Sequence, residues 1–554
     1  MKAKQWLLLL TFGLLLSLLA ACSDDETKKP ASNEPKEEEQ AKEKVLSFIN
    51  PEAIPSMDPS KATDESSFVY LAATMEGLYR LDEKTQTAPG MAIDHEVSTD
   101  GLTWTFNLRE DAKWSNGDPV TAHDFVYAWQ RAVNPETGSE YGPYMMNGVI
   151  KNAEAISKGE LTPDKLGVKA DGDYKFVVEL ENPTPYFETL TTFGTFFPLN
   201  QKFVEEKGAD FALSTENLLA NGPYTISDWT STSDKWNLVK NEKYWDAKTV
   251  KMDKLTFTVV KDPQTALSLY EEGTVQRIDL TSDLVDQYST NEDYAVSADT
   301  FVYFLKFNQT TSDALANKNI RAAISRAFNK EALVDEILNN GSIAANGLIP
   351  KDFTPIPESG EDFRKVSGDL VTYDLEAAKE LWAKGLAEIG TDSVEIEFLA
   401  DDDQTTKILI EYVANQLSTN LDGLKVNIKQ IPKKQRLELD KSMEYELQLT
   451  RWGPDFLDPY TYMLLFTTDS GNNMTGYSSP VYDKLVFDTA STLATDNVAR
   501  YKNFLEAEKV LFEDAAIAPV YQASRAQLIS PKVQGVFVNP FGATYEYKWA
   551  DVAE

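Results

Sequence analysis

Two histidines and one cysteine are the only residues of their types in this 554-residue chain, so they are the first places to look for chemistry. His95 and His123 have no partner at a metal-ligand spacing, and each stands among residues typical of turns or strands. The sequence also lacks a G-x-S-x-G nucleophile elbow, a Walker phosphate loop and a G-x-G-x-x-G dinucleotide motif. We therefore expect structural histidines, no catalytic residue, no metal and no cofactor.

Carboxylates are the remaining candidates for acid–base chemistry, and a surface hydrolase with a carboxylate pair is a hypothesis that composition leaves open. The run Asp401-Asp402-Asp403 illustrates the choice. It precedes a helix-like stretch, where negative charge is favoured by the positive end of the helix dipole. We interpret it as a solvated helix start, and an enzyme as the least favoured class.

Cys22 follows a segment with the features of a secretory signal. A basic start, Met1–Lys4, leads into the apolar run Trp6–Leu16, and small residues precede the cysteine. Leu19-Ala20-Ala21-Cys22 fits the bacterial lipobox, in which the cysteine is acylated and becomes the mature N-terminus. We predict a signal peptide over residues 1–21 and a lipid on Cys22 that holds the protein on the outer face of the cell membrane. A cleaved signal with an accidental cysteine is the alternative.

The composition after the signal is that of an acidic extracytoplasmic protein. Residues 22–44 are polar and nearly free of large apolar side chains, which predicts a flexible tether. A net charge of −35 argues against nucleic acid as a partner and against electrostatic docking on anionic lipids. Hydrophobic content of 42% is ample for two or three lobes, and a single cysteine excludes disulfides within the chain.

Hydrophobic periodicity indicates a mixed α/β fold with at least two lobes. Residues 103–108 and 394–399 alternate apolar and polar side chains in the manner of half-buried strands. A helix-like stretch at about 406–417 and a strand at 424–428 follow the second of these, which predicts a βαβ unit and a parallel sheet. A continuous helix is expected at about 319–338, with a stop at Asn340-Gly341.

Five motifs in order carry a family resemblance. They are Met57-Asp58-Pro59, Glu76-Gly77-Leu78-Tyr79, the long stretch Leu102 to Phe125, Trp452-Gly453-Pro454-Asp455, and Gly476 to Asp483. Their order and spacing resemble the large extracytoplasmic solute-binding proteins for peptides, within them the oligopeptide-binding (OppA-type) branch, from about residue 45 to the C-terminus. We interpret the long stretch as architecture, with Trp114 in the core and Asn116-Gly117-Asp118-Pro119 in a tight turn.

The fold that the resemblance implies is an α/β bilobal clamp with three domains, in which the chain crosses the hinge twice. The expected first lobe combines residues 45–90, 215–300 and 525–554, the inserted second domain covers 91–214, and the opposite lobe covers 301–524. Ligand binding between the lobes would favour the closed form. The resemblance also implies a membrane permease of an ABC importer as partner, and a monomer, since the clamp must open.

The resemblance places an amine anchor at Asp455, three residues after Trp452. A buried carboxylate there would hold the α-ammonium of a peptide, Trp452 would form an apolar wall, and Gly453 would let backbone approach closely. The alternative is an aspartate that only caps a turn after Pro454. Tyr141 falls where the family places a hydroxyl near the same amine.

Two further groups of residues follow from the resemblance. Thr63-Asp64-Glu65 falls where the family pairs its backbone with the peptide by β-augmentation, so their side chains need not matter. Tyr521 aligns with a pocket-lining tyrosine. The basic residues that meet the peptide carboxylate in the best-known members have no clear counterpart in Lys433-Lys434-Gln435-Arg436 or Arg451, so the preferred length is left open.

The main hypothesis is a protein that binds extracellular oligopeptides and delivers them to an ABC permease. A receptor for signalling, pheromone-like peptides on the same importer is the alternative within the fold. Haem, glutathione or nickel chelates, which other members of the family carry, are also open as cargo.

Overall fold

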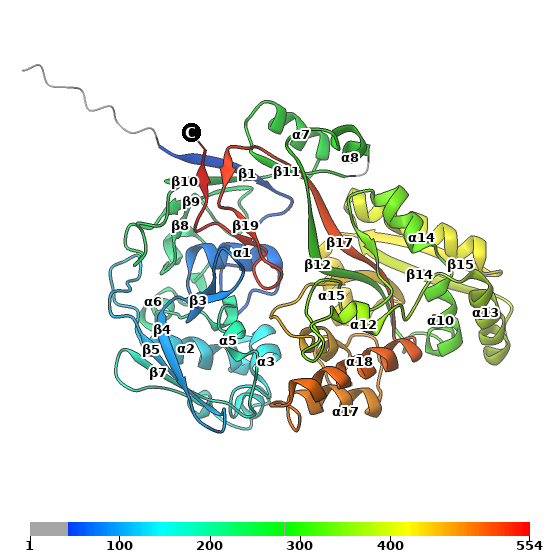
Figure 1. Ribbon diagram of the computed structural model, residues 1–554, viewed down its shortest axis with the longest axis horizontal. Coiled ribbons are helices and arrows are strands. Elements are labelled where there is room, and N and C mark those ends of the chain that lie inside the picture. Colours follow the sequence, from blue (N-terminus) through cyan, green and yellow to red (C-terminus); the bar gives the residue numbers. More distant parts are fainter. Residues whose placement is uncertain (1–42, 282, 554) are drawn as a thin grey trace, which may run out of the picture. The chain divides into compact units, whose positions relative to one another are not determined.

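The computed structural model describes residues 43–281 and 283–553, and every element below belongs to that part of the chain (Figure 1). The predicted signal peptide, Cys22 and the predicted tether up to residue 42 lie outside the described residues. Folded chain begins where the sequence indicated, with β1 at Val45–Asn50. Among the helices of the described part, none combines the length and apolar character that crossing a bilayer requires.

The first sheet joins the start of the folded chain to a segment about two hundred residues later. Its strands, in spatial order, are β1 (Val45–Asn50), β10 (Lys254–Val259), β9 (Lys235–Lys240) and β8 (Tyr224–Ser227). β1 pairs with β10 in parallel, and the other pairs are antiparallel. Helix α1 (Glu65–Thr74) packs on this sheet, where the ring of Tyr70 meets the edges of Trp236 and Phe257 at 5.1 Å.

The second sheet is antiparallel and contains the strand predicted at 103–108. Its order is β4 (Ala92–Val97), β5 (Thr103–Leu108), β7 (Lys175–Glu179) and β6 (Val168–Ala170), with α2 (Ala122–Val133) packed against it. Trp114 is buried and Gly117 has a φ of +100°, as a core tryptophan and a tight turn require. His95 stacks on Trp104 at 4.7 Å and its Nδ1 is hydrogen-bonded to the Tyr79 hydroxyl, so it is structural.

The third and largest sheet contains the predicted βαβ unit. Its strands are β11 (Arg277–Asp279), β17 (Ile517–Ile529), β12 (Tyr294–Phe307), β16 (Leu447–Trp452), β14 (Val394–Asp401) and β15 (Leu424–Ile431), with β13 (Ile343–Ala344) paired to β17. β14 and β15 are parallel and α14 (Gln404–Asn420) connects them, which confirms the prediction. Asp403 caps α14 by accepting from the Thr406 N–H at 2.9 Å, as expected of a helix start.

The continuous helix predicted at 319–338 is interrupted. The structure has α10 (Lys318–Arg326), α11 (Lys330–Ala332) and a π-helix (Leu333–Leu338). The break occurs because Asn329 leaves the helical conformation and its side chain accepts from the Ala332 N–H, which starts a new helix. The predicted apolar face is nevertheless buried, because Ile324 and Phe328 pack in the core of the third sheet.

Strands β12 and β17 carry the chain past the predicted limits of the lobes. They pair with each other over most of their length, with register shifts between Ala298 and Val302 and between Tyr303 and Phe304. The limits predicted at 300/301 and 524/525 fall inside these two strands. Both predicted hinge crossings therefore fall within the paired strands β12 and β17. The domain limits themselves remain a prediction.

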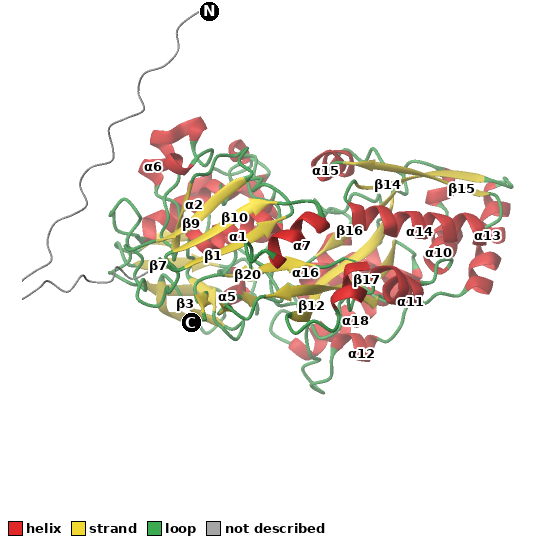
Figure 2. Cartoon of the chain, turned by 90° about the horizontal axis from the view of Figure 1, so that it is seen from above, coloured by secondary structure: helices red, strands yellow, loops and turns green. Residues whose placement is uncertain are grey.

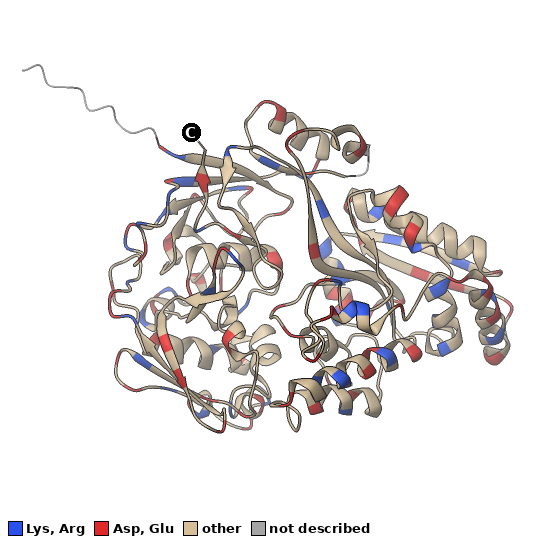
Figure 3. Cartoon of the chain, viewed as in Figure 1, with Lys and Arg blue, Asp and Glu red and all other residues tan. Residues whose placement is uncertain are grey.

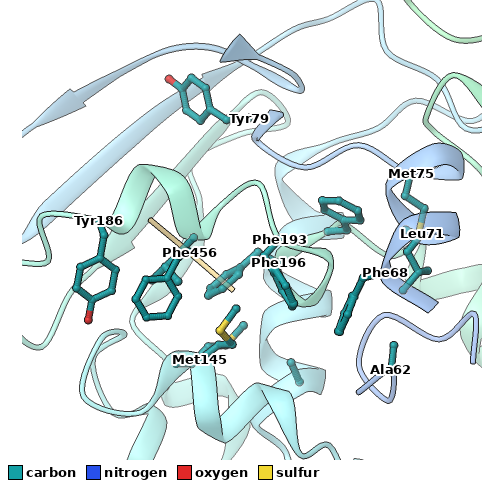
Figure 4. Packing of buried hydrophobic residues seen from close by; sticks show 14 of the residues in the cluster. Ala62, Phe68, Leu71, Met75, Tyr79, Met145, Tyr186, Phe193, Phe196 and Phe456 are labelled. Atoms are coloured by element: carbon teal, nitrogen blue, oxygen red, sulfur yellow. The ribbon is translucent and has the colours of Figure 1, made fainter. Parts of the chain in front are cut away.

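Helices cover the sheets, and aromatic side chains pack in the core between them. Further helices are α3 (Tyr141–Met146), α13 (Leu375–Ile389), α15 (Lys433–Lys441), α16 (Tyr460–Met463), α17 (Pro480–Thr489) and α18 (Asn497–Glu513). Helices α10, α13 and α14 gather at the β14–β15 side of the third sheet in both views (Figures 1 and 2). Figure 4 shows Phe68 of α1 beside Phe193, and Tyr186 against Phe456 with ring centroids 4.6 Å apart.

Charged residues of both signs are interspersed along the elements rather than gathered by sign (Figure 3). Among the described residues, no group of three or more His, Cys, Asp or Glu is arranged to hold a metal ion. His123 lies exposed on α2, 3.6 Å from the carboxylate of Asp173.

Candidate functional site

Asp455 is a buried carboxylate whose Oδ2 has no hydrogen-bond partner among the described residues. It follows β16 in the loop after Trp452, and only 8% of the residue is accessible. Its Oδ2 is fully enclosed and accepts no hydrogen bond from the described residues. The turn is bonded through the backbone instead, where the Asp455 N–H donates to Thr461 Oγ1 at 3.2 Å. The side chain is therefore not used as the turn cap that the alternative interpretation required.

The environment of Asp455 resists negative charge. Burial raises the pKa of this carboxyl to about 7, and only the neighbouring Tyr144 hydroxyl acts to lower it. That hydroxyl makes no hydrogen bond of standard geometry, and Tyr144 Oη is itself buried and without a partner in the described chain. A buried carboxylate of this kind gains most from a cation that brings its own N–H donors.

Three tyrosines face the charge of Asp455. Burial first, and then the charge of Asp455, raises the pKa of Tyr141 and Tyr144. For Tyr462, burial and then the charge of Asp299 raise the pKa more than Asp455 does. Tyr141, the hydroxyl expected near the amine, stands at the start of α3, stacks on Phe193 at 5.7 Å and also senses the charge of Asp64. Tyr462 donates to the carbonyl of Thr300 at 2.6 Å, so its hydroxyl is already engaged.

Trp452 and Gly453 shape one wall beside the carboxylate. Trp452 ends β16 opposite Val302, and its ring meets that of Tyr144 edge-on at 5.9 Å. A Cβ on Gly453 would lie 2.5 Å from ring carbons of Phe301, so the close approach expected at this glycine involves an aromatic ring of the protein. Glycine is required here because any side chain would displace Phe301.

The segment Thr63-Asp64-Glu65 presents an unpaired backbone edge. Asp64 is extended, with φ −135° and ψ 153°, and caps α1 by accepting from the Ser67 N–H at 2.9 Å and the Ser67 hydroxyl at 2.7 Å. Thr63 is exposed. Within the described residues, neither backbone group of Thr63 nor the N–H of Asp64 has a hydrogen-bond partner. An extended chain laid beside them would supply those bonds.

The Glu65 side chain was expected to be unimportant, but it is the centre of an ion cluster. Its carboxylate lies 3.0 Å from Arg525 and 3.3 Å from Arg451, and accepts from the Thr544 hydroxyl at 2.5 Å. Burial alone would raise the pKa of Glu65, but the two arginines lower it to about 2. The first turn of α1 is thereby fixed to β16 and β17.

Arg451 connects the Glu65 ion cluster to two stacked tyrosines, Tyr303 and Tyr521. Arg451 donates to the Tyr303 hydroxyl at 2.8 Å and lies over the Phe301 ring at 4.9 Å. Tyr303 in turn stacks on Tyr521 at 4.3 Å across the β12–β17 pair. Tyr521 is only 4% accessible, and its role as a pocket-lining tyrosine remains a prediction.

A family model described as bacterial extracellular solute-binding proteins, family 5 Middle, matches residues 86–474. The chain belongs to this family. A dipeptide-binding protein of Lactococcus lactis subsp. cremoris is 35% identical over 529 residues, covering 92% of this chain and 94% of that protein. The structure of Listeria monocytogenes OppA bound to peptide is 41% identical with a TM-score of 0.87, covering 93% of this chain and 100% of that one. That of the pheromone receptor PrgZ is 36% identical with a TM-score of 0.86, covering 92% and 100%.

Membership in the family decides three earlier expectations. The fold is the mixed α/β clamp of these solute-binding proteins, as predicted. The protein is a transport binding protein and not an enzyme, so the hydrolase hypothesis is wrong. It acts outside the cytoplasm, as the signal indicated.

Sequence reasoning missed several residues of the site. Tyr144 lies one helical turn after Tyr141, and that i, i+3 spacing is a signal that could have found it. Phe301 and Tyr303 had no such signal, because they reach the site only through the pairing of β12 with β16. Two of the other basic candidates form ion pairs, Lys433 with Glu52 at 3.3 Å and Arg436 with Asp401 at 2.6 Å.

Proposed function

We propose that this protein binds extracellular peptides by their α-ammonium group, which Asp455 receives. The observation that carries the proposal is the buried Asp455 carboxylate, whose Oδ2 has no partner among the described residues and whose pKa burial raises to about 7. An ammonium group would supply both the positive charge and the N–H donors that the site lacks. The dipeptide- and peptide-binding proteins to which the chain is similar support a peptide as the ligand.

The peptide backbone pairs with the free edge at Thr63-Asp64-Glu65. The pKa of Tyr141 supports this placement, because after burial the charges of both Asp455 and Asp64 raise it. Backbone pairing gives affinity that does not depend on the ligand's side chains, which suits a binder of many sequences. The indole of Trp452 offers an apolar surface to the first side chain of the ligand.

The loaded protein then delivers its peptide to the membrane permease of an ABC importer. A lipid on Cys22 retains it at the membrane, and the segment 22–44 acts as a tether of about 25 Å reach. The protein works as a monomer, because each copy carries a complete site. Labelling of Cys22 by a radioactive fatty acid in cells, abolished in Cys22→Ser, tests the anchor.

Mass spectrometry of ligand released from natively purified protein tests the peptide proposal. A mixture of peptides with free amines and varied sequences supports it, and a released haem or metal chelate contradicts it. One dominant sequence would instead favour a signalling-peptide receptor, which the similarity to the pheromone receptor PrgZ keeps as the second candidate.

A further inference from the structure

We propose that a three-residue bulge in β12, residues 299–301, positions both parts of the peptide site at once: the amine anchor at Asp455 and the free backbone edge before α1. The inference rests on the proposed function, since it assumes a peptide whose amine sits at Asp455. It adds positioning residues that act through the Asp455 loop and through α1 rather than on the peptide itself.

The β12 bulge lies where the site begins. It is bounded by two pairs of the β12–β17 register, Ala298 with Ser524 and Val302 with Gln522. Its three residues therefore stand opposite Ala523 alone. Pairing of β12 with β16 starts directly after the bulge, where Val302 lies opposite Trp452, and the loop that carries Asp455 leaves the sheet at the end of β16. Bulges re-aim the side chains of a strand and are common beside functional sites.

Thr300 connects the bulge to the loop that carries Asp455. The Thr300 carbonyl accepts from the Tyr462 hydroxyl at 2.6 Å, and Tyr462 is fully buried in α16. The adjacent residue of α16, Thr461, accepts the Asp455 N–H on its hydroxyl oxygen at 3.2 Å. The Thr300 hydroxyl donates to the carbonyl of Pro540 at 2.7 Å. Helix α16, and with it the backbone of Asp455, is thereby fixed to the bulge.

Phe301 packs on the same loop. A Cβ on Gly453, two residues before Asp455, would lie 2.5 Å from the Phe301 ring, so the ring lies directly against the bare Cα of that glycine. The bulge thus supports the Asp455 loop at two points, by a ring contact where the loop starts and by a hydrogen bond through α16 where it ends.

Asp299 connects the bulge to the free backbone edge. Its Oδ1 accepts from the N–H groups of Thr300 at 2.7 Å and Phe301 at 3.2 Å, which fixes the shape of the bulge. Its Oδ2 accepts from Arg525 Nε at 2.8 Å, and Arg525 Nη2 donates in turn to Glu65 at 3.0 Å. Glu65 is the first residue of α1, directly after the free edge. One guanidinium therefore joins the buried carboxylate of Asp299 to the start of α1.

The two supports share one short segment, so a disturbance on one side should reach the other. The alternative is that Asp299 and Thr300 brace their own neighbours independently. The two cases differ in one measurable respect: only in the first does breaking the Asp299 side alter the hold on a peptide amine at Asp455.

Two buried tyrosines separate the bulge from general support of α16. Tyr462 donates to the Thr300 carbonyl, and Tyr482 of α17 donates to the Met463 carbonyl in α16; both bonds are 2.6 Å long and both residues are fully buried. Calorimetric titration of Tyr462→Phe and Tyr482→Phe with trialanine and N-acetyl-trialanine measures the affinity penalty for acetylation. We expect this penalty, about tenfold or more in the wild type, to fall by about three- to tenfold in Tyr462→Phe and to stay unchanged in Tyr482→Phe. Comparing two peptides on one variant cancels any loss of folded protein.

Asp299→Asn tests whether the bulge connects the two sides. Asparagine keeps an oxygen for the N–H groups of Thr300 and Phe301 but removes the charge that holds Arg525. We expect the acetylation penalty to fall by a similar factor, although the lost ion pair lies on the side of α1. In the double variant with Tyr462→Phe the penalty should fall no further than in the stronger single variant, whereas two independent supports would multiply their effects.

Three outcomes would overturn the inference: equal penalties in Tyr462→Phe and Tyr482→Phe, an unchanged penalty in Asp299→Asn, or effects that multiply in the double variant. The wild type separates this inference from the proposed function. Equal affinity of trialanine and N-acetyl-trialanine for the wild type refutes the amine anchor itself. A wild-type penalty that every variant retains leaves the anchor intact and removes only the role of the bulge.

Discussion

Asp455 and Asp458 lie three residues apart and are both buried, yet only Asp458 has a counter-ion. Arg500 holds the Asp458 carboxylate through two nitrogens, each at 3.0 Å, and this pair is enclosed by protein. No described residue donates a hydrogen bond of standard geometry to Asp455 Oδ2. One loop thus carries a paired carboxylate that stabilises the fold and a second one that, in our proposal, receives the ammonium group of the ligand.

Replacing Asp455 by asparagine should stabilise the ligand-free protein at neutral and higher pH. Burial raises the pKa of Asp455 from 3.8 to about 7, so the folded state keeps a proton that the unfolded state releases between these values. The free energy of unfolding therefore falls as pH rises through this range, by at most about 4 kcal/mol. Urea unfolding at pH 5 and pH 8 should show this loss in the wild type and not in Asp455→Asn.

Asp458→Asn is the matched control and should behave in the opposite way. It leaves the buried guanidinium of Arg500 unpaired, which costs about 3–5 kcal/mol of unfolding free energy. Equal stability changes in the two variants would show that the aspartates do not differ as described.

Peptide affinity should depend on pH with a maximum between about 7 and 8. Asp455 must be ionised to attract the ammonium group, so affinity declines below its pKa of about 7. The α-amine itself loses its proton above about pH 8, so affinity declines there as well. Titration calorimetry from pH 5.5 to 9.5 should trace this profile, and a flat profile would refute an ionised Asp455 as the anchor.

Glu65→Gln should make the protein less stable and alter its acid unfolding. The two arginines outweigh burial and lower the pKa of Glu65 from 4.5 to about 2, so the ionised form stabilises the fold above pH 4.5. That stabilisation, about 3 kcal/mol, is lost as pH falls through about 2. Unfolding free energies between pH 6 and 2.5 should fall less steeply in the variant; parallel curves would contradict the ion cluster.

Gly453→Ala should destabilise the protein by about 1–3 kcal/mol through overpacking. The new methyl group would lie 2.5 Å from the ring of Phe301. Thermal unfolding measures the cost. The double substitution Gly453→Ala, Phe301→Leu should be less destabilised than the two single changes predict together, whereas strict additivity would show that this contact is not the cause.

Local patterns in the sequence predicted local structure well. Alternation predicted β5 and β14, because one face of each strand is buried, and Asp403 was recognised as a helix start. The helix at 319–338 was predicted as continuous, but it is interrupted at Asn329, although its apolar face continues past that residue. The periodicity of apolar residues reports which face is buried, and it does not reveal that the Asn329 side chain caps a new helix.

The ion cluster could not be predicted from the sequence. Glu65 and Arg451 are separated by 386 positions, and nothing in either neighbourhood marks them as partners. The family resemblance pointed to Asp455, but its lack of a partner and its altered pKa are properties of the folded environment. Sequence therefore indicated which carboxylate to examine, and packing determined what that carboxylate can bind.

The affinity of one peptide with a free and with an acetylated amine, measured on the wild type and on Asp455→Asn, tests the central claim most directly. We predict that acetylation weakens binding to the wild type by at least about tenfold, since it leaves the buried carboxylate unpaired. In Asp455→Asn the two forms should bind with nearly equal, low affinity. Equal affinity of both forms for the wild type would contradict the account.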